Sequence, residues 1–165
     1  MDVILKHEPM TIPTYEPYAA NTLPFFLEKK AYQGATGRIY PVPYTDRLSN
    51  KPVDKDYDSY TLENEHVKVV LLPELGGKIH GAVDKHNNYE FIYQNTVIKP
   101  AMVGIAGPWV SGGVEFNWPQ HHRPTTFMPL EATPKKNADG SVTVWMGEAE
   151  PFHRMRGMVG ITVYP

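Results

Sequence analysis

The sequence contains no cysteine among its 165 residues, which excludes disulfide bonds and thiolate metal sites. This absence fits a reducing compartment, so we expect a cytoplasmic protein. A surplus of charge is also lacking, because 16 basic and 18 acidic residues leave a formal net charge of −2. Without a basic surplus, neither nucleic acid nor an anionic membrane is an expected partner.

Long apolar runs are absent too. No segment approaches the roughly 18 apolar residues that a membrane span needs. The first ten residues, MDVILKHEPM, mix acidic, basic and apolar groups and lack the apolar centre of a signal peptide. A chain of this length most simply forms one domain. We therefore expect a soluble, single-domain protein.

Helix-forming runs are scarce, whereas proline is abundant. The 16 prolines are about twice the usual share for a chain of this length. Proline removes a backbone donor and breaks the interior of a helix. Together with ten tyrosines, this composition predicts little helix. We expect an all-β fold, an antiparallel β-sandwich.

The first third of the chain differs from the remainder. Residues 1–56 show no sustained hydrophobic period and alternate prolines with aromatic residues. A disordered tail would be poor in aromatics. We therefore expect an extended arm over residues 1–56 that packs on a β-sandwich formed by residues 57–165. A partly ordered linker is the alternative, and a short edge strand is expected near Gly37–Pro43.

From Tyr57 onward the pattern predicts strands. Apolar and polar residues alternate through Tyr60–Leu62 and Val67–Leu71, which is the period of a half-buried strand. Pro73–Gly77 interrupts the pattern, because paired glycines admit backbone angles closed to other residues. The elements expected after this break are a strand at Ile79–Val83, a turn at Asp84–Asn88, a strand at Tyr89–Gln94, a short strand or helical turn within 95–107, a strand at Thr125–Thr133, an Asp-Gly turn at Asn137–Gly140, and strands at Ser141–Glu148 and Met158–Tyr164.

The second half adds two expectations. Within Ser141–Glu148, we expect Val142, Val144 and Met146 to share one face. The sequence also ends on a predicted strand, and an exposed strand edge invites pairing. We therefore expect an incomplete sandwich that hides this edge by forming a homodimer or by folding the arm across it.

One stretch, GPWVSGGVEFNWPQHHRP (107–124), concentrates the groups able to hold a polar ligand. In a strand, Glu115 and Asn117 would share one face and Phe116 and Trp118 the other. The polar run 121–123 would lie on the loop beyond, where binding groups tend to lie on a rigid scaffold.

This mixture suits a sugar, which needs an aromatic ring for its C–H face and amides, carboxylates and arginine for its hydroxyls. A tryptophan taken singly is more often a core residue, and a glutamate or asparagine is more often solvated, so the clustering carries the hypothesis. Adjacent histidines point apart, and the spacing does not decide which one faces the ligand. The candidate sugar-binding residues are Trp109, Glu115, Asn117, Trp118, His121, His122 and Arg123.

A metal site is the rival interpretation of this cluster. Glu115, His121 and His122 offer ligand types that zinc accepts. Their spacing matches no short zinc motif such as HExxH. The glycine pairs 76–77 and 112–113 lack the lysine of a phosphate-binding loop. We therefore expect neither a metal nor a cofactor.

Two long segments, YTLENEHVKVVLLPELGGKIHGAVDKHNNYEFIYQN (60–95) and VIKPAMVGIAGPWVSGGVEFNWPQHHRPTTFMP (97–129), closely resemble a family of large bacterial proteins. That family joins a domain of unknown function, similar to the galactose mutarotase-like β-supersandwich, to C-terminal tetratricopeptide repeats. Within the wider mutarotase-like superfamily, GGVEFNWPQHH (112–122) is similar to a segment of hexose-6-phosphate epimerases whose histidine helps to hold the sugar. This resemblance implies that His121 or His122 contacts the sugar, with Arg123 beside it. It also implies that this chain is the N-terminal part of the supersandwich and that the epimerase's catalytic glutamate and second histidine lie beyond residue 165.

Three functions follow as hypotheses. The first is carbohydrate binding through the 109–123 stretch without complete catalysis, with a pyranose or oligosaccharide as partner. The second is a sugar epimerase or glycoside-processing enzyme whose site is completed beyond residue 165, with Glu115 as candidate base and His122 as candidate acid. The third is a structural or protein-interaction module that serves the repeats.

Overall fold

The computed structural model describes residues 2–25, 40–45, 47–103, 107–118, 125–151 and 153–165. It confirms an all-β chain built from antiparallel sheets. The larger sheet has the order β1 (Ile4–Thr14), β4 (Val53–Glu63), β5 (Val67–Leu72), β6 (Lys78–Asp84) and β7 (Tyr89–Ile92). The smaller sheet has the order β10 (Glu131–Lys136), β11 (Val142–Glu150) and β12 (Met155–Val163). Two further strand pairs are β2 (Asn21–Phe25) with β3 (Tyr40–Tyr44), and β8 (Ala101–Val103) with β9 (Gly107–Trp109).

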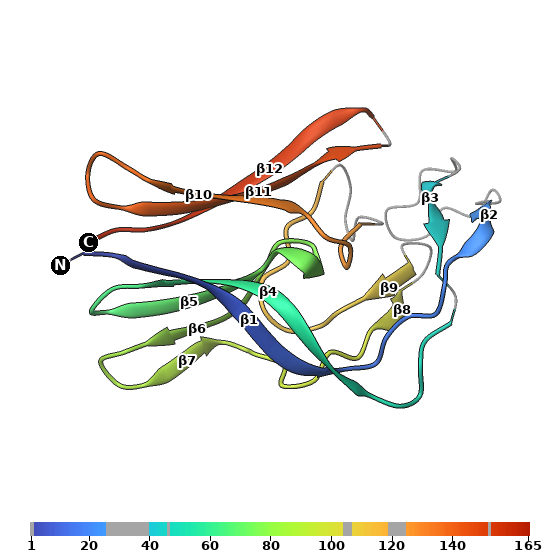
Figure 1. Cartoon of the computed structure of the whole chain (residues 1–165), viewed down its shortest axis with the longest axis horizontal. Coiled ribbons are helices and arrows are strands. Elements are labelled where there is room, and N and C mark those ends of the chain that lie inside the picture. The colour runs from blue at the N-terminus through green and yellow to red at the C-terminus, as the bar shows by residue number, and fades with distance from the viewer. Residues whose placement is uncertain (1, 26–39, 46, 104–106, 119–124, 152) are drawn as a thin grey trace.

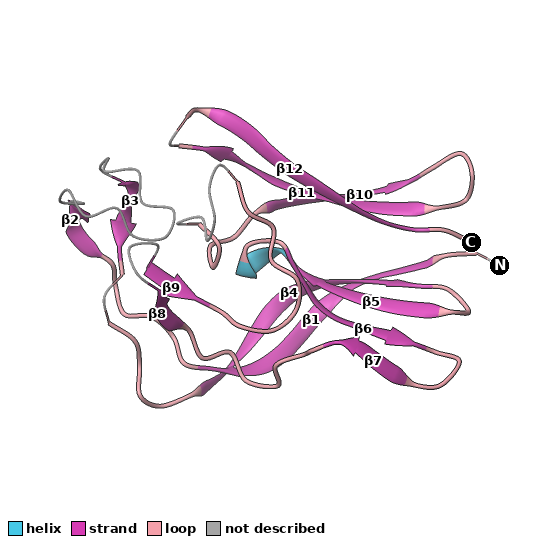
Figure 2. Cartoon of the chain, turned by 180° about the vertical axis from the view of Figure 1, so that it is seen from behind, coloured by secondary structure: helices cyan, strands magenta, loops and turns pink. Residues whose placement is uncertain are grey.

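The two larger sheets pack face to face as a sandwich. Figure 1 shows the β10–β12 sheet lying over the five-stranded sheet, and Figure 2 shows the same two layers from behind. Leu62 and Leu71 enter the shared core from the larger sheet, and Val144 and Met146 enter it from β11. All four are fully buried. The alternation predicted for β4, β5 and β11 therefore marks the buried faces of the sandwich.

The first strand belongs to the sheet itself. Residues 4–14 pair along their whole length with β4, so the sheet does not begin at residue 57 behind an arm of residues 1–56, as the sequence suggested. Most side chains of β1 are exposed, which removes the hydrophobic alternation that sequence patterns detect. Pro9 and Pro13 are tolerated because β1 is an edge strand, where a missing N–H breaks no inner ladder.

The interruption at 73–77 is confirmed. Pro73–Leu75 forms a single 3-10 turn, and Gly76 and Gly77 follow with φ of 71° and 69°. An added Cβ on Gly76 would lie 2.0 Å from the carbonyl oxygen of Thr126. Gly76 is therefore required both by its left-handed backbone and by the close approach of the 125–130 segment.

Other predicted boundaries need correction. Residues 125–128 form a turn closed by the Met128 N–H on the Thr125 carbonyl at 2.9 Å, and strand β10 begins only at Glu131. Residues 115–118 form no strand, because their neighbour Val114 makes a single bridge to Ile79 and the ladder does not continue. Within 95–107, the described residues 101–103 form a strand and not a helical turn.

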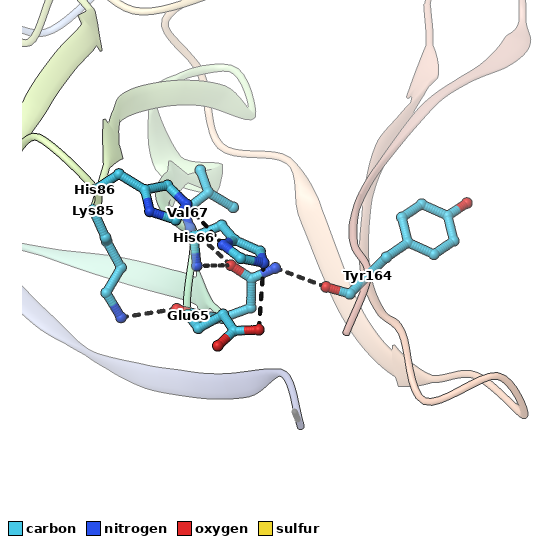
Figure 3. A network of polar contacts seen from close by, with 7 residues as sticks. Glu65, His66, Val67, Lys85, His86 and Tyr164 are labelled. Atoms are coloured by element: carbon cyan, nitrogen blue, oxygen red, sulfur yellow. Dashed lines mark hydrogen bonds and ion pairs between the residues drawn. The ribbon is translucent and has the colours of Figure 1, made fainter.

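The turns after β6 and β10 match the sequence, and a third turn ties the sheets together. Asn64, between β4 and β5, donates to the Tyr164 carbonyl at 2.9 Å. Beside it, the His66 and His86 rings stack with centroids 4.9 Å apart (Figure 3). The Asn64–Tyr164 hydrogen bond joins the two sheets at the end where both chain termini lie (Figure 1). Among the described residues, no helix is long and apolar enough to cross a membrane.

Candidate functional site

Four of the predicted ligand-binding residues lie in the described part of the chain, namely Trp109, Glu115, Asn117 and Trp118. His121, His122 and Arg123 lie outside it. The segment that holds the four leaves β9, turns at Gly112 and Gly113, and crosses the start of β6.

The crossing is fixed by backbone hydrogen bonds and by glycine. Ile79 and Val114 exchange N–H to carbonyl bonds of 3.2 and 2.9 Å, and Gly113 donates to the Tyr93 carbonyl at 2.7 Å. Gly113 has φ of 68°. A Cβ at this position would lie 2.1 Å from the Ile79 carbonyl oxygen, so only glycine lets the segment approach β6 this closely.

Trp109 and Glu115 form the first polar pair of the site. The Trp109 indole Nε1 donates to the Glu115 carboxylate at 2.5 Å. Both side chains are half-buried. The bond holds an aromatic face and a carboxylate in a fixed relation, which is a combination able to contact a sugar's C–H face and its hydroxyls together. Asn117, two residues on, is exposed.

Trp118 has a different environment. Its ring packs against the shared core of the sandwich, and a Cβ on Gly157 of β12 would lie 2.0 Å from its Nε1. Nε1 donates to Glu148 at 3.2 Å, and the Thr125 hydroxyl donates to the same carboxylate oxygen at 2.6 Å. These contacts anchor the 114–118 segment to the second sheet, so they support a packing role for this tryptophan.

Lys78 is a residue of the site that the sequence analysis did not identify. It is only 3% exposed, and its ammonium donates to the carbonyls of Val110 at 2.8 Å and Ser111 at 3.4 Å. Burial lowers the pKa of Lys78 to about 8, although the nearby Glu115 carboxylate opposes this shift.

His80 lies two residues further along the same strand and is also 3% exposed. Burial, together with the positive charge of Lys78, lowers the pKa of His80 to about 4. The imidazole is therefore neutral near pH 7. Lys78, His80 and Glu115 together form an electrostatically coupled group beside Trp109, and such groups with perturbed pKa values cluster at functional sites.

The rival metal site is only partly visible. Within the described ranges, no group of three or more histidine, aspartate or glutamate side chains is placed to hold a metal ion. Of the three ligands considered for zinc, only Glu115 lies in the described part of the chain, and its carboxylate accepts a hydrogen bond from the Trp109 indole.

A cavity of about 330 Å³ lies next to the group formed by Lys78, His80 and Glu115. Val110, whose carbonyl binds Lys78, forms part of its wall, with Ile98 and Phe127. Tyr57 also lines it, and its hydroxyl is 2.9 Å from the Thr14 hydroxyl. Burial raises the pKa of Tyr57. The volume lies at the lower end of the range of small-molecule pockets.

Fold and site thus define an all-β sandwich domain with a buried lysine and histidine beside an indole–carboxylate pair. The chain belongs to the family described as Domain of unknown function (DUF5107), whose model matches residues 35–164. It is also similar to the crystal structure of a TPR-domain-containing protein from Parabacteroides distasonis, with a TM-score of 0.84 and 27% sequence identity. The match covers 99% of this chain and 27% of that chain, so the chain spans about a quarter of the length of its structural neighbour.

Proposed function

We propose that the chain is a carbohydrate-binding portion of a galactose mutarotase-like domain and that it binds a pyranose or oligosaccharide through the 109–123 stretch. The observation that carries the proposal is the Trp109–Glu115 hydrogen bond at 2.5 Å. It presents an aromatic ring and a carboxylate side by side, and the same carboxylate interacts electrostatically with the buried Lys78 ammonium. The antiparallel sandwich supports a mutarotase-like architecture at the level of fold class.

The proposal predicts a loss of sugar affinity in the Glu115→Gln variant. Glutamine keeps an oxygen for the Trp109 indole but loses the charge, and hydrogen bonds to charged acceptors contribute more than neutral ones. We expect the dissociation constant to rise at least tenfold, or about 1.4 kcal/mol. Titration calorimetry against a panel of monosaccharides and oligosaccharides would measure it.

Glu65→Gln is the matched control, because Glu65 lies at the opposite end of the β5–β6 hairpin, in the β4–β5 turn (Figure 3). It should leave affinity within twofold of the wild type. Equal affinity in Glu115→Gln and the wild type, or sugar density away from the 109–123 stretch in a soaked crystal, would contradict the proposal.

A second candidate function is sugar epimerisation or glycoside processing by a longer protein. The buried, electrostatically linked Lys78 and His80 favour it, because catalytic acids and bases have perturbed pKa values. In that protein, Glu115→Gln and His122→Ala should each reduce turnover by at least 100-fold, measured by anomer exchange in NMR. Unchanged turnover in both variants would remove these two residues from the catalytic set.

A third candidate is a protein-interaction module. The similarity to a TPR-domain-containing protein favours it, since repeat arrays present extended binding surfaces. Sugar titrations that give no heat with any member of the panel would favour this candidate over the first.

A further inference from the structure

Two histidines meet where the β4–β5 turn lies beside the β6–β7 turn. His66 comes from the first turn and His86 from the second. Their ring centroids are 4.9 Å apart, and the Nδ1 of His66 lies 2.8 Å from the Nε2 of His86 (Figure 3). The two residues are 20 positions apart in the sequence, and only the pairing of β5 with β6 brings them together. The spacing of histidines in the sequence therefore gave no reason to expect a metal here.

The backbone holds both turns in place around this pair. The Lys85 N–H donates to the His66 carbonyl at 2.8 Å, which ties one turn to the other. The Asn64 side chain accepts from the N–H of His66 at 2.8 Å, and the Asp84 carboxylate accepts from the N–H of His86 at 2.9 Å. Each imidazole is thus carried by a fixed backbone, so a ligand that uses both rings loses little conformational entropy.

The two nitrogens have the spacing of neighbouring ligands on one metal ion. Imidazole nitrogens bind first-row metal ions at about 2.0 Å, so two of them at a right angle lie about 2.8 Å apart. At the tetrahedral angle of zinc they would lie about 3.3 Å apart. The 2.8 Å between His66 and His86 therefore matches the square-planar or tetragonal geometry that Cu²⁺ and Ni²⁺ prefer.

A carboxylate favours the nitrogen of His66 that such an ion needs. The Nε2 of His66 lies 3.3 Å from Glu65 (Figure 3), and a carboxylate beside one ring nitrogen favours a proton on that nitrogen. The lone pair of the neutral ring is then on Nδ1, which faces His86. A carboxylate behind the imidazole is also the usual second partner of a metal-binding histidine.

We propose that His66 and His86 form a two-imidazole site for a divalent late transition metal ion, with Cu²⁺ or Ni²⁺ as the preferred ion. Within the described ranges, no third histidine, aspartate or glutamate completes the set, so water fills the remaining coordination positions. The ion takes the place of the proton shared between the two rings, and the proton of His86 moves to Nδ1. The broad terminal torsion of histidine lets both rings turn toward the ion. The site cross-links two turns, so its effect is on stability.

NMR of the full chain during a Cu²⁺ titration tests the location of the site. Cu²⁺ is paramagnetic and broadens the signals of nearby nuclei. At less than one equivalent of Cu²⁺, we expect the amide signals of Val67 and Lys85 to disappear first, because both residues adjoin the histidine pair. Earlier loss of signals elsewhere in the chain would overturn the proposal.

Calorimetric Cu²⁺ titration of variants tests the two ligands. His66→Gln and His86→Gln should each raise the dissociation constant of the tightest site at least tenfold. The double variant should lose no more than either single variant, because one imidazole alone does not chelate. Glu65→Gln should fall between the wild type and His66→Gln, since it keeps both ligands and removes only the carboxylate behind one of them.

His7→Gln is the matched control for these titrations. His7 also contacts a carboxylate, that of Asp58, but its ring stacks on Tyr60 and not on a histidine. This variant should keep the dissociation constant within twofold of the wild type. Wild-type affinity in His66→Gln, or losses that add up in the double variant, would overturn the proposal. Circular dichroism checks that each variant folds, and the broadening pattern of the wild type decides the question if one does not.

Discussion

Replacing Gly113 by alanine should lower the free energy of unfolding by roughly 3 kcal/mol, a size typical of strained-backbone and overpacking substitutions. Gly113 has φ of 68°, where an alanine Cβ costs about 1–2 kcal/mol. That Cβ would also lie 2.1 Å from the Ile79 carbonyl oxygen. The atom that this Cβ would meet belongs to the backbone and not to a flexible side chain. The two backbone hydrogen bonds between Ile79 and Val114 must therefore break. Urea unfolding followed by circular dichroism would measure the loss.

Gly140→Ala is the matched control for this prediction. Gly140 has φ of 84°, but its Cβ would meet only the ring of Pro165, at 3.2 Å. This variant should lose about 1 kcal/mol from backbone strain alone. The difference between the two variants isolates the close approach of the 112–115 segment to β6. Equal losses would show that this approach contributes nothing to stability.

The Gly113→Ala substitution also tests whether the geometry of the candidate site matters for sugar binding. The Ile79–Val114 bridge positions Glu115 against the Trp109 indole and near Lys78. If the carbohydrate hypothesis holds, Gly113→Ala should reduce sugar affinity at temperatures where the variant is still folded. Gly140→Ala should not, because it lies in the hairpin turn between β10 and β11. Unchanged sugar affinity in folded Gly113→Ala would show that binding does not depend on the Ile79–Val114 bridge.

Strands with one buried face could be predicted from the sequence, whereas the others could not. Val69 and Leu71 project from one face of β5 into the core between the two sheets, and this shared face is also the period-2 signal in the sequence. β1 has little buried apolar surface, so its pairing with β4 leaves no periodic trace. For Glu115–Trp118 the strand prediction is wrong for the opposite reason. Polar and aromatic residues alternate there, but the bridge from Val114 to Ile79 on β6 does not continue into a ladder.

The candidate site shows a similar division. Clustering in the sequence identified Trp109 and Glu115, and the structure brings them into direct contact. Lys78 and His80 lie about 30 residues earlier, and they reach this site only because the 110–115 segment folds back across β6. Such a contact depends on the crossing of two distant segments, for which spacing within either segment gives no signal.

Stability should fall by roughly 3 kcal/mol as the pH drops from about 6.5 to 4, through His80 alone. The folded-state pKa of His80 is about 4, against an ordinary value of 6.5. Between these values the unfolded chain binds a proton that the folded chain does not, so stability declines as pH falls. Below pH 4 both states are protonated and the contribution is constant. In His80→Leu this component should vanish, measured as the difference between wild-type and variant unfolding free energies at each pH.

The Lys78→Met variant separates the pH dependence of stability due to His80 from that due to Lys78. The pKa of Lys78 is about 8 in the folded state against an ordinary 10.5, so Lys78 costs stability as pH falls from about 10.5 to 8 and adds a constant cost below that. Lys78→Met should therefore remove the loss of stability that occurs as pH falls from about 10.5 to 8. It should also shrink the acid loss modestly, because the lysine charge is the second cause of the low His80 pKa. An acid loss between pH 6.5 and 4 that persists unchanged in His80→Leu would assign it to groups other than His80. Glu63, whose pKa is lowered by its hydrogen bond with Lys85, loses its contribution only as pH falls below about 4.5.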